Sequence, residues 1–450
     1  MNAEMRCYVC SDSSWHSMGK LHAESEILVC KTCGNVAHRV DVSKEEELKN
    51  YYRYDYRPAP NHMNLVTTTH KRVYIARFLQ KFLDERDPKT TGKTMVTGDV
   101  GCATGYIPAW LAGVGHRSTG CELTASYRRF TEAFYGIPIP EELDTKHKYD
   151  LITVYHVLEH LMDPDKKLAH YRSLLADDGR ILVSTPEWFD VLEEASGSNI
   201  NSFEHLFHKN HINVFSAASL KNIFAKAGLE IVQEDHIQYG QTYLLKKCEP
   251  QPLKVLEPWE SMVDKLERTK KAILYHTSGR HEMALDAWKR FPEAWIALAH
   301  GKESKDPEKQ ADIFARGLQA LPDNMRLALA YATWLYMRED IPAALKVYER
   351  VNALKPNETV SVFMGYCLGK LGRFKEAAQA FYGASEVNPL KWAECMDNIC
   401  AIAVRQPHWE ERAMEKLKAA AVKGIIENGG APKLVDPRLE ETKTKEATPQ

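Results

Sequence analysis

Four cysteines near the start of the chain have the spacing of a metal site. Cys7 and Cys10 form one Cys-x-x-Cys pair, and Cys30 and Cys33 form a second pair after nineteen intervening residues. Each pair can present two thiolates from one tight turn, and four thiolates in a tetrahedron suit Zn²⁺. We expect one structural zinc ion here; free or redox-active thiols are the alternative, although redox chemistry more naturally uses one pair at a helix start. Further candidate ligands are His16, His22 and His38.

A glycine-rich stretch, DVGCATGY at 99–106, forms a second chemical motif. An apolar strand from about Met95 ends in a turn with glycines at 101 and 105, and a helix is expected from about Pro108. Glycine adopts the backbone conformations of a sharp turn and lets amide groups and a helix N-terminus approach a ligand. The arrangement is typical of a nucleotide site in an α/β sheet, although such a turn alone is a weak indicator.

A carboxylate follows this turn at a meaningful distance. Glu122 lies seventeen residues after Gly105, at the end of the next predicted strand, 118–122. In nucleotide-binding α/β sheets, an acid at this position accepts hydrogen bonds from both ribose hydroxyls. The alternative is an exposed loop acid, and the position after this particular turn favours the functional interpretation.

Histidines gather where a general base could be useful. His156 directly follows a predicted strand, and His205, His208 and His211 lie together after the last parallel strand, where such sheets place an acceptor pocket. Because histidine exchanges a proton near neutral pH, we expect His156, His205 or His211 to be the base, with His211 favoured. The alternatives are that these histidines are structural, or, less favoured, that the later cluster binds a metal.

The elements that must position these residues alternate between strand and helix, which indicates a mostly parallel sheet with helical crossovers. A third strand, near 135–140, is indistinct because prolines occupy alternate positions. The predicted strands are 95–100, 118–122, 149–154 and 180–184, with a closing hairpin at 229–233 and 239–245; the predicted helices are 70–85, 166–175 and one that starts at Ser216 or Ser219.

In this order and spacing, DVGCATGY, the acid at 122, YDLITVYHVLEHLMDP and LLADDGRILVSTPE resemble a class I S-adenosylmethionine-dependent methyltransferase with a Rossmann-like sheet. A dehydrogenase is disfavoured because the turn lacks the third glycine of the dinucleotide motif. The resemblance implies a cofactor site at Asp99, Gly101, Cys102, Ala103, Gly105, Glu122, Tyr155 and His156. Glu122 would hold the ribose, and His156 would lie near the sulfonium. Ala103 departs from the pattern, since the family usually has glycine there.

An N-terminal zinc module joined to this domain resembles the methyltransferases that act on carbon in nucleotide-linked deoxysugars. In those relatives a histidine in a Glu-His segment deprotonates the acceptor, and Glu204–His205 and His211 both partly match it. The relatives end in a second α/β domain, which is not found here. We expect a small-molecule acceptor, with a protein methyltransferase or a non-catalytic scaffold as alternatives. Nucleic acid is disfavoured because no Asn-Pro-Pro-Tyr, Asp-Pro-Pro-Tyr or Pro-Cys motif occurs.

The C-terminal part of the chain has a helical period. Pro322, Pro356 and Pro389 are spaced by 34 and 33 residues, and Ala344 and Ala377 precede the last two by twelve. Aromatic residues recur eight residues before each proline, at Phe314, Tyr348 and Phe381. The pattern resembles the tetratricopeptide repeat, which implies a surface for a protein partner. A helical cap that packs only on the catalytic domain is the alternative.

Length and charge complete the expectations. A chain of 450 residues needs several cores, and a net charge of −2 indicates no polyelectrolyte partner. Because no signal segment or membrane span is evident, we expect a cytoplasmic protein. The expected parts are a zinc-ribbon module at 1–45 with ligands outside the large sheet, a helical, tyrosine-rich connector at 46–94, the methyltransferase domain at 95–248, helical repeats at 259–428 and a disordered tail at 429–450. The tyrosines of the connector are expected to pack an interface, with a lid over a ligand as the alternative.

Overall fold

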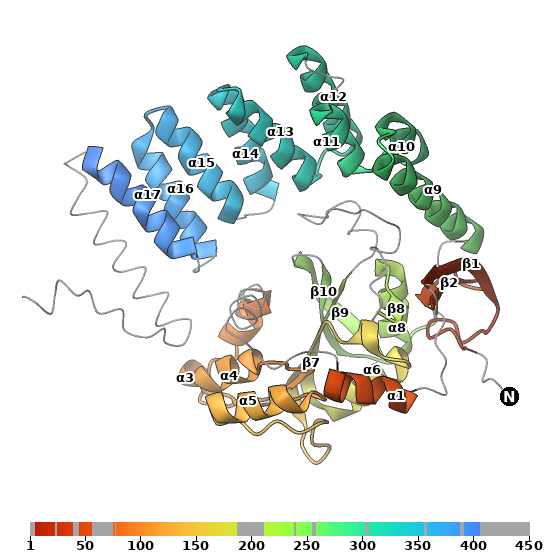
Figure 1. The fold of residues 1–450 in the computed structure, drawn as a ribbon. Helices are drawn as coiled ribbons and strands as arrows, with labels where there is room; N and C mark the ends of the chain where they lie inside the picture. The colour runs from red at the N-terminus through yellow and green to blue at the C-terminus, as the bar shows by residue number, and fades with distance from the viewer. Residues whose placement is uncertain are drawn as a thin grey trace, which may run out of the picture.

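Two β-sheets and an array of helices make up the protein (Figure 1). The fold was analysed in a computed structural model. It describes residues 5–22, 25–38, 45–55, 75–76, 78–186, 211–237, 240–253, 258–301, 306–354, 358–387 and 391–405.

The larger sheet has the order β5-β4-β6-β7-β10-β9. Strands β4, β5, β6 and β7 are parallel, and the hairpin β9–β10 adds to β7 in the antiparallel sense. Its strands are β4 (Val96–Val100), β5 (Arg117–Cys121), β6 (Tyr149–Tyr155), β7 (Leu175–Pro186), β9 (Leu229–Ile237) and β10 (Gly240–Lys247). The predicted α/β sheet with its closing hairpin is therefore confirmed. Residues 136–140 form no strand, as their alternate prolines predict, because proline donates no ladder hydrogen bond.

Side-chain alternation along the strands gives this sheet two buried faces. Leu151 and Leu182 pack with Ile75 and Leu79 on one face. Their strand neighbours, among them Ile152, belong to the core on the opposite face. The helices around the sheet are α3 (Pro88–Thr91), α4 (Tyr106–Gly113), α5 (Ala125–Tyr135), α6 (Pro164–Leu174) and α8 (Ala217–Lys226), and α1 (Glu45–Asn50) precedes them. As predicted, α8 starts at Ser216, whose side chain accepts a hydrogen bond from the Ser219 amide.

The smaller sheet joins two distant segments of the chain. Its order is β1-β2-β3-β8, and β8 comes from the connection that follows β7. The strands are β1 (Trp15–His22), β2 (Ser25–Cys30), β3 (Val36–His38) and β8 (Asn213–Val214). Cys7 and Cys30 share a core cluster with Phe215 and with Val183 of the large sheet. The cysteines thus lie outside the strands of the large sheet, as expected, but Cys7 and Cys30 belong to the same core cluster as that sheet, so the N-terminal module packs against it.

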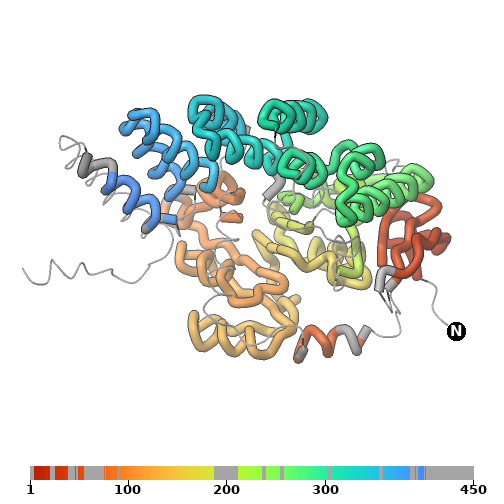
Figure 2. The backbone as a smooth tube through the Cα atoms, turned by 45° about the horizontal axis from the view of Figure 1, so that its top comes forward, coloured from red at the N-terminus to blue at the C-terminus, as the bar shows by residue number. Residues whose placement is uncertain are grey.

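Helices α9 to α17 form an array that extends along one side of the α/β part in both views (Figures 1 and 2). The members are α9 (Trp259–Thr277), α10 (His281–Ala287), α11 (Pro292–His300), α12 (Pro307–Ala320), α13 (Met325–Met337), α14 (Ile341–Leu354), α15 (Glu358–Lys370), α16 (Phe374–Val387) and α17 (Trp392–Arg405). Ala344, Ala377, Tyr348 and Phe381 are all buried, as the repeat pattern requires. The tetratricopeptide identity and the partner remain predictions.

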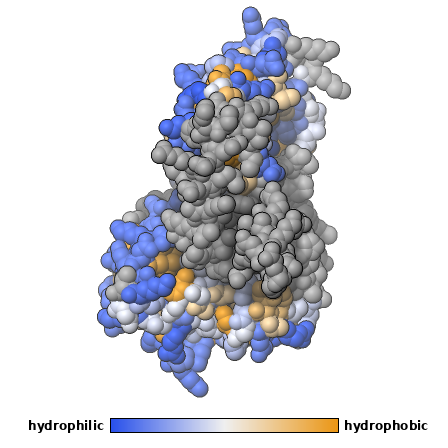
Figure 3. Space-filling model, turned by 90° about the vertical axis from the view of Figure 1, so that its left-hand side faces the viewer, coloured by the Kyte–Doolittle hydropathy of each residue, from blue (hydrophilic) through white to orange (hydrophobic). Residues whose placement is uncertain are grey.

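The described surface gives no sign of a membrane segment. Among the helices that the structure describes, none combines the length and the hydropathy needed to cross a bilayer. On the face shown in Figure 3, hydrophilic residues predominate at described positions, and hydrophobic residues form small, separate patches.

Two glycines in α15 allow a matched test of the helix packing. A Cβ atom at Gly365 would lie 2.6 Å from the Phe381 ring, whereas one at Gly369 would meet nothing within 4 Å. We expect Gly365→Ala to destabilise the array by about 1–3 kcal/mol through overpacking. Gly369→Ala should instead stabilise it by roughly 1 kcal/mol through helix propensity. Urea unfolding followed by circular dichroism measures both, and equal effects of the two substitutions would contradict this packing.

Candidate functional site

The carboxyl ends of three neighbouring parallel strands bring the predicted cofactor residues together. The glycine-rich loop follows β4, Glu122 follows β5, and His156 follows β6. β4 lies between β5 and β6, so the chain crosses to opposite sides of β4 in its successive connections. This is the topological switch point at which open α/β sheets bind their ligands.

The loop after β4 has a conformation that favours glycine. Gly101, Ala103 and Gly105 have φ values of 64°, 47° and 71°. A Cβ atom at Gly101 would lie 2.7 Å from Val157 Cγ2, and one at Gly105 would lie 2.1 Å from Thr131 Cγ2. Ala103, where the family usually has glycine, is thus a non-glycine residue in the left-handed region, which costs on the order of 1 kcal/mol.

Hydrogen bonds hold the loop in place. The Glu122 carboxylate accepts from the Ala103 amide (3.0 Å) and from the Thr124 amide (2.8 Å). The Asp99 carboxylate is buried and accepts from the Thr153 hydroxyl at 2.6 Å. Glu122 therefore couples the end of β5 to the loop, and Asp99 couples β4 to β6. The residues fit a nucleoside ligand because they combine a glycine turn, amide groups and an acid at the switch point.

His156 begins the connection after β6 in an unusual backbone conformation. Its φ is 54°, and its amide donates to the Ser184 carbonyl at 2.8 Å. Its ring packs on the Tyr155 ring, with centroids 4.4 Å apart. Nδ1 lies 3.5 Å from Oε1 of Glu159, which is longer than a hydrogen bond. The side chain is one-third exposed, so it can reach a ligand at the sheet edge.

Glu159, His160 and His211 form a cluster whose candidate ligand atoms all lie within 4.8 Å of one another. The His160 and His211 ring centroids are 4.9 Å apart, and Tyr52 Oη lies 2.9 Å from His160 Nδ1. Glu159 is almost fully buried, and burial raises the pKa of its carboxyl to about 8. Glu159 and His160 belong to the motif YDLITVYHVLEHLMDP, whose resemblance to the family implies no role for either residue. The close spacing His-x-x-Glu-His after a strand was the available signal.

The predicted histidines thus separate into two groups. His156 and His211 flank the edge of the sheet, whereas Glu204, His205 and His208 lie outside the described residues.

In the connector, Tyr52 contacts two parts of the site. Its carbonyl accepts a hydrogen bond from the Thr124 hydroxyl at 2.9 Å, close to Glu122, and its hydroxyl lies beside His160. This contact fits the predicted interface packing, while the lid over a ligand stays a prediction.

The four N-terminal cysteines converge as their spacing predicts. Cys7 Sγ lies 3.6 Å from Cys33 Sγ, and Cys10 Sγ lies 3.5 Å from Cys30 Sγ, and none forms a disulfide. A tetrahedron of thiolates at zinc has edges of about 3.8 Å, so the spacing fits a zinc ion. Gly34 has φ of 69°, the left-handed turn expected after the second pair.

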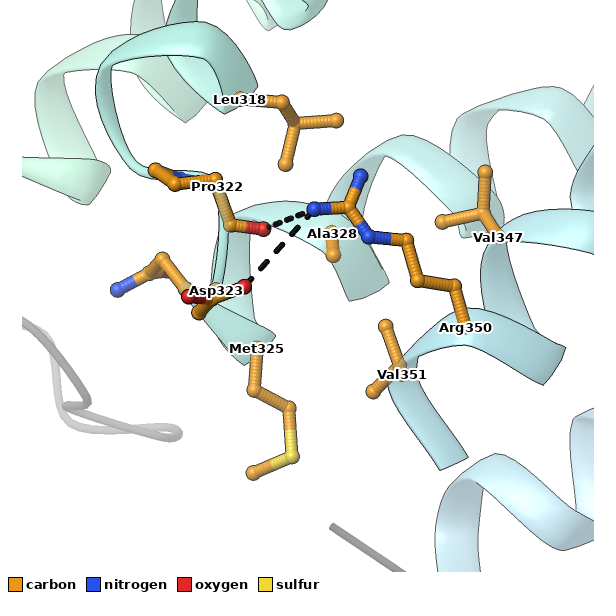
Figure 4. Close-up of a pocket in the computed structure, with 9 residues that line it drawn as sticks. Leu318, Pro322, Asp323, Met325, Ala328, Val347, Arg350 and Val351 are labelled. Atoms are coloured by element: carbon orange, nitrogen blue, oxygen red, sulfur yellow. Dashed lines mark hydrogen bonds and ion pairs between the residues drawn. The ribbon is translucent and has the colours of Figure 1, made fainter. Parts of the chain in front are cut away.

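A small crevice in the helical array is not a cofactor site. It holds about 40 Å³ and is lined by Leu318, Met325 and Val351 among others, with Arg350 across its mouth (Figure 4). Arg350 donates to the Pro322 carbonyl at 2.7 Å. This volume has room for a few water molecules only, and small-molecule sites are typically about 300–1,000 Å³.

Comparison with known proteins identifies the central part of the chain. Residues 67–234 match the model of a family described as a methyltransferase domain. The ubiquinone biosynthesis O-methyltransferase of Glaesserella parasuis serovar 5 (strain SH0165) is 28% identical over 120 residues, which are 23% of this chain and 50% of that protein. This chain therefore spans half the length of its curated relative.

Solved structures of methyltransferases also match. Magnesium protoporphyrin IX methyltransferase from Synechocystis PCC 6803 is 16% identical, with a TM-score of 0.31 over 46% of this chain and 95% of that one. The 1,6-didemethyltoxoflavin-N1-methyltransferase from Burkholderia thailandensis is 17% identical, with a TM-score of 0.30 over 53% of this chain and 100% of that one.

The buried position of the cysteines predicts the effect of removing one. Cys7→Ser should lower the zinc content below one ion per chain and also lower the melting temperature of the α/β part, since Cys7 lies in the core beside Phe215. Cys248→Ser, at a partly exposed free cysteine, is the control. Elemental analysis and thermal unfolding are the measurements. Full zinc content in Cys7→Ser would refute the assignment.

Proposed function

We propose that residues 67–234, which match the model of a methyltransferase domain, transfer a methyl group from S-adenosylmethionine to a small molecule. The observation that carries the proposal is the convergence of the glycine-rich loop, Glu122 and His156 at one edge of the sheet. Bound S-adenosylmethionine supplies a methyl group that is already activated toward nucleophiles. The protein then has to orient the acceptor, exclude water and take up a proton.

The residues that would hold the cofactor follow from the loop geometry. Gly101, Cys102, Ala103 and Gly105 form the turn under the methionine end, and Glu122 lies where the ribose would bind. Glu122 already accepts the Ala103 amide, so one side chain both shapes the loop and offers acceptor oxygens. Asp99 and Thr153 fix the floor of this site.

His156 is our choice for the general base. It follows the strand that ends at the switch point, and its ring is held between Tyr155 and the buried Glu159 carboxylate. These contacts support His156 over His211, which the sequence pattern favoured. His205 stays a prediction.

The acceptor that this arrangement suits carries a group that loses a proton, such as a hydroxyl or an acidic C–H. The curated relative is named as an O-methyltransferase, and the zinc-module resemblance favours a nucleotide-linked sugar. Transfer of labelled methyl from S-adenosylmethionine into a small-molecule extract tests this class. Label found only in protein would instead favour protein methylation, and no label in either fraction would contradict catalysis.

Cofactor binding is expected to depend on Glu122. Glu122→Ala should weaken S-adenosylhomocysteine binding by roughly 1–3 kcal/mol, because hydrogen bonds to a charged group are lost. Glu132→Ala, which removes an exposed acid from α5, is the matched control. Isothermal calorimetry measures both. Unchanged affinity in Glu122→Ala would show that another residue holds the ribose.

Turnover is expected to depend on His156. Asparagine tolerates the left-handed backbone at this position, so His156→Asn keeps the loop and removes the base. We expect kcat to fall about 10²–10⁴-fold, while S-adenosylhomocysteine affinity stays near that of the wild type. Steady-state kinetics with the acceptor found above is the measurement. Near-normal turnover would mean that positioning alone accounts for catalysis.

A further inference from the structure

In the cluster of Glu159, His160 and His211, the carboxylate of Glu159 is buried without a hydrogen bond from any described residue. Glu159 is 1% exposed, and within the described part of the chain neither carboxylate oxygen accepts a hydrogen bond. His156 Nδ1, at 3.5 Å, is too far to supply one. Burying a carboxylate without partners is costly, so its retention in this position calls for a positive ligand.

The two histidines complete a set of ligands around this carboxylate. All three candidate ligand atoms lie within 4.8 Å of one another, so a small side-chain adjustment brings them to the roughly 2.0–2.2 Å bond lengths of one metal ion. The hydroxyl of Tyr52 bonds His160 at Nδ1, and such outer partners orient metal-ligating histidines.

Separate parts of the backbone hold the cluster in place. The Asn213 side-chain amide donates to the carbonyls of Leu158 (3.0 Å) and Leu161 (2.6 Å), on either side of the turn that carries Glu159 and His160. Asn213 itself opens β8, two residues after His211. One hydrogen-bonded residue therefore fixes His211, which lies just before β8, relative to the other two side chains.

We propose that Glu159, His160 and His211 bind a divalent first-row transition metal ion at the acceptor side of the methyltransferase site. Two imidazoles and one carboxylate suit Zn²⁺, Mn²⁺, Fe²⁺ or Co²⁺ better than Ca²⁺ or Mg²⁺. Three protein ligands leave coordination positions open, as in catalytic metal sites. One Glu159 oxygen can bind the ion while the other faces His156.

The role of the ion rests on the proposed function. An acceptor hydroxyl bound at an open position would lose its proton to His156 more readily, because the metal lowers its pKa. The acceptor oxygen then forms the new bond to the methyl carbon, the carbon–sulfur bond breaks, and S-adenosylhomocysteine leaves as a neutral thioether. Metal binding itself does not depend on this role.

Cobalt titration of the full chain tests the site. The protein is first given one equivalent of Zn²⁺, which the four-thiolate site takes up in preference to two imidazoles and a carboxylate, and Co²⁺ is then added and quantified after gel filtration. We expect one further equivalent of cobalt without the charge-transfer absorption of a cobalt–thiolate site. Absence of this equivalent from the wild-type protein would overturn the proposal, whatever the variants do.

Three variants locate the ion. His160→Ala, His211→Ala and the isosteric Glu159→Gln should each weaken cobalt binding by about tenfold or more. His147→Ala, at a histidine whose side chain is 55% exposed, should bind as the wild type does. Equal losses in the control, or wild-type binding in the three cluster variants, would overturn the site.

A parallel titration with S-adenosylhomocysteine separates this proposal from the previous one. Cofactor binding without cobalt binding would overturn the metal site and leave the methyltransferase proposal standing. Cobalt binding without cofactor binding would leave the metal site standing and would contradict the methyltransferase proposal.

Discussion

A small sheet whose strands β2, β3 and β8 are covered on both faces is the constraint on which the arrangement of the whole protein depends. Along β2, Ile27 and Val29 face the helical array, where they pack with residues such as Leu266, while Cys30 belongs to the core of the catalytic sheet. Strands β3 and β8 repeat this division, with Val36 and Val214 on one side and Ala37 and Phe215 on the other. A strand alternates its side chains with a period of two, so a slip of one residue would exchange the side chains that face the two cores. The register of this sheet is therefore strongly specified.

This sheet also determines the geometry of the acceptor side. Its fourth strand, β8, starts two residues after His211 and carries Asn213, which binds the turn around Glu159 and His160. Lys226 of α8 connects the N-terminal module to the large domain a second time. It donates a hydrogen bond to the Tyr8 carbonyl at 3.0 Å and forms an ion pair with Asp165 at 2.7 Å. The N-terminal module that carries the four cysteines thus helps to hold the site. Unfolding of this module is therefore expected to disturb the residues at the carboxyl edge of the large sheet.

Local patterns predicted much of this molecule, and long-range pairing accounts for what they missed. Strand–turn–helix periodicity located the loop after β4, Glu122 and His156, because each lies within a few residues of its own signal. No local pattern can show that residues 213–214 pair with β3, since the partners are far apart in sequence and two residues carry no periodicity. Tyr52 and His160 are also far apart in sequence. The sequence therefore predicts only that Tyr52 packs an interface, and it cannot predict the hydrogen bond between Tyr52 and His160.

Two strained residues and one buried carboxylate lie at the same edge of the large sheet. Ala103 and His156 are non-glycine residues with positive φ, and each costs on the order of 1 kcal/mol or more. The buried carboxylate of Glu159 adds a desolvation cost a few residues further on. Such costs persist only where the surrounding structure over-determines them, and here β4, β6 and the small sheet do so from three sides. The helical array has its own examples in Glu339, whose φ is also positive, and in the buried Glu293 carboxylate. At the large sheet, however, these groups lie in the connections that follow β4 and β6, which is where open α/β sheets bind their ligands.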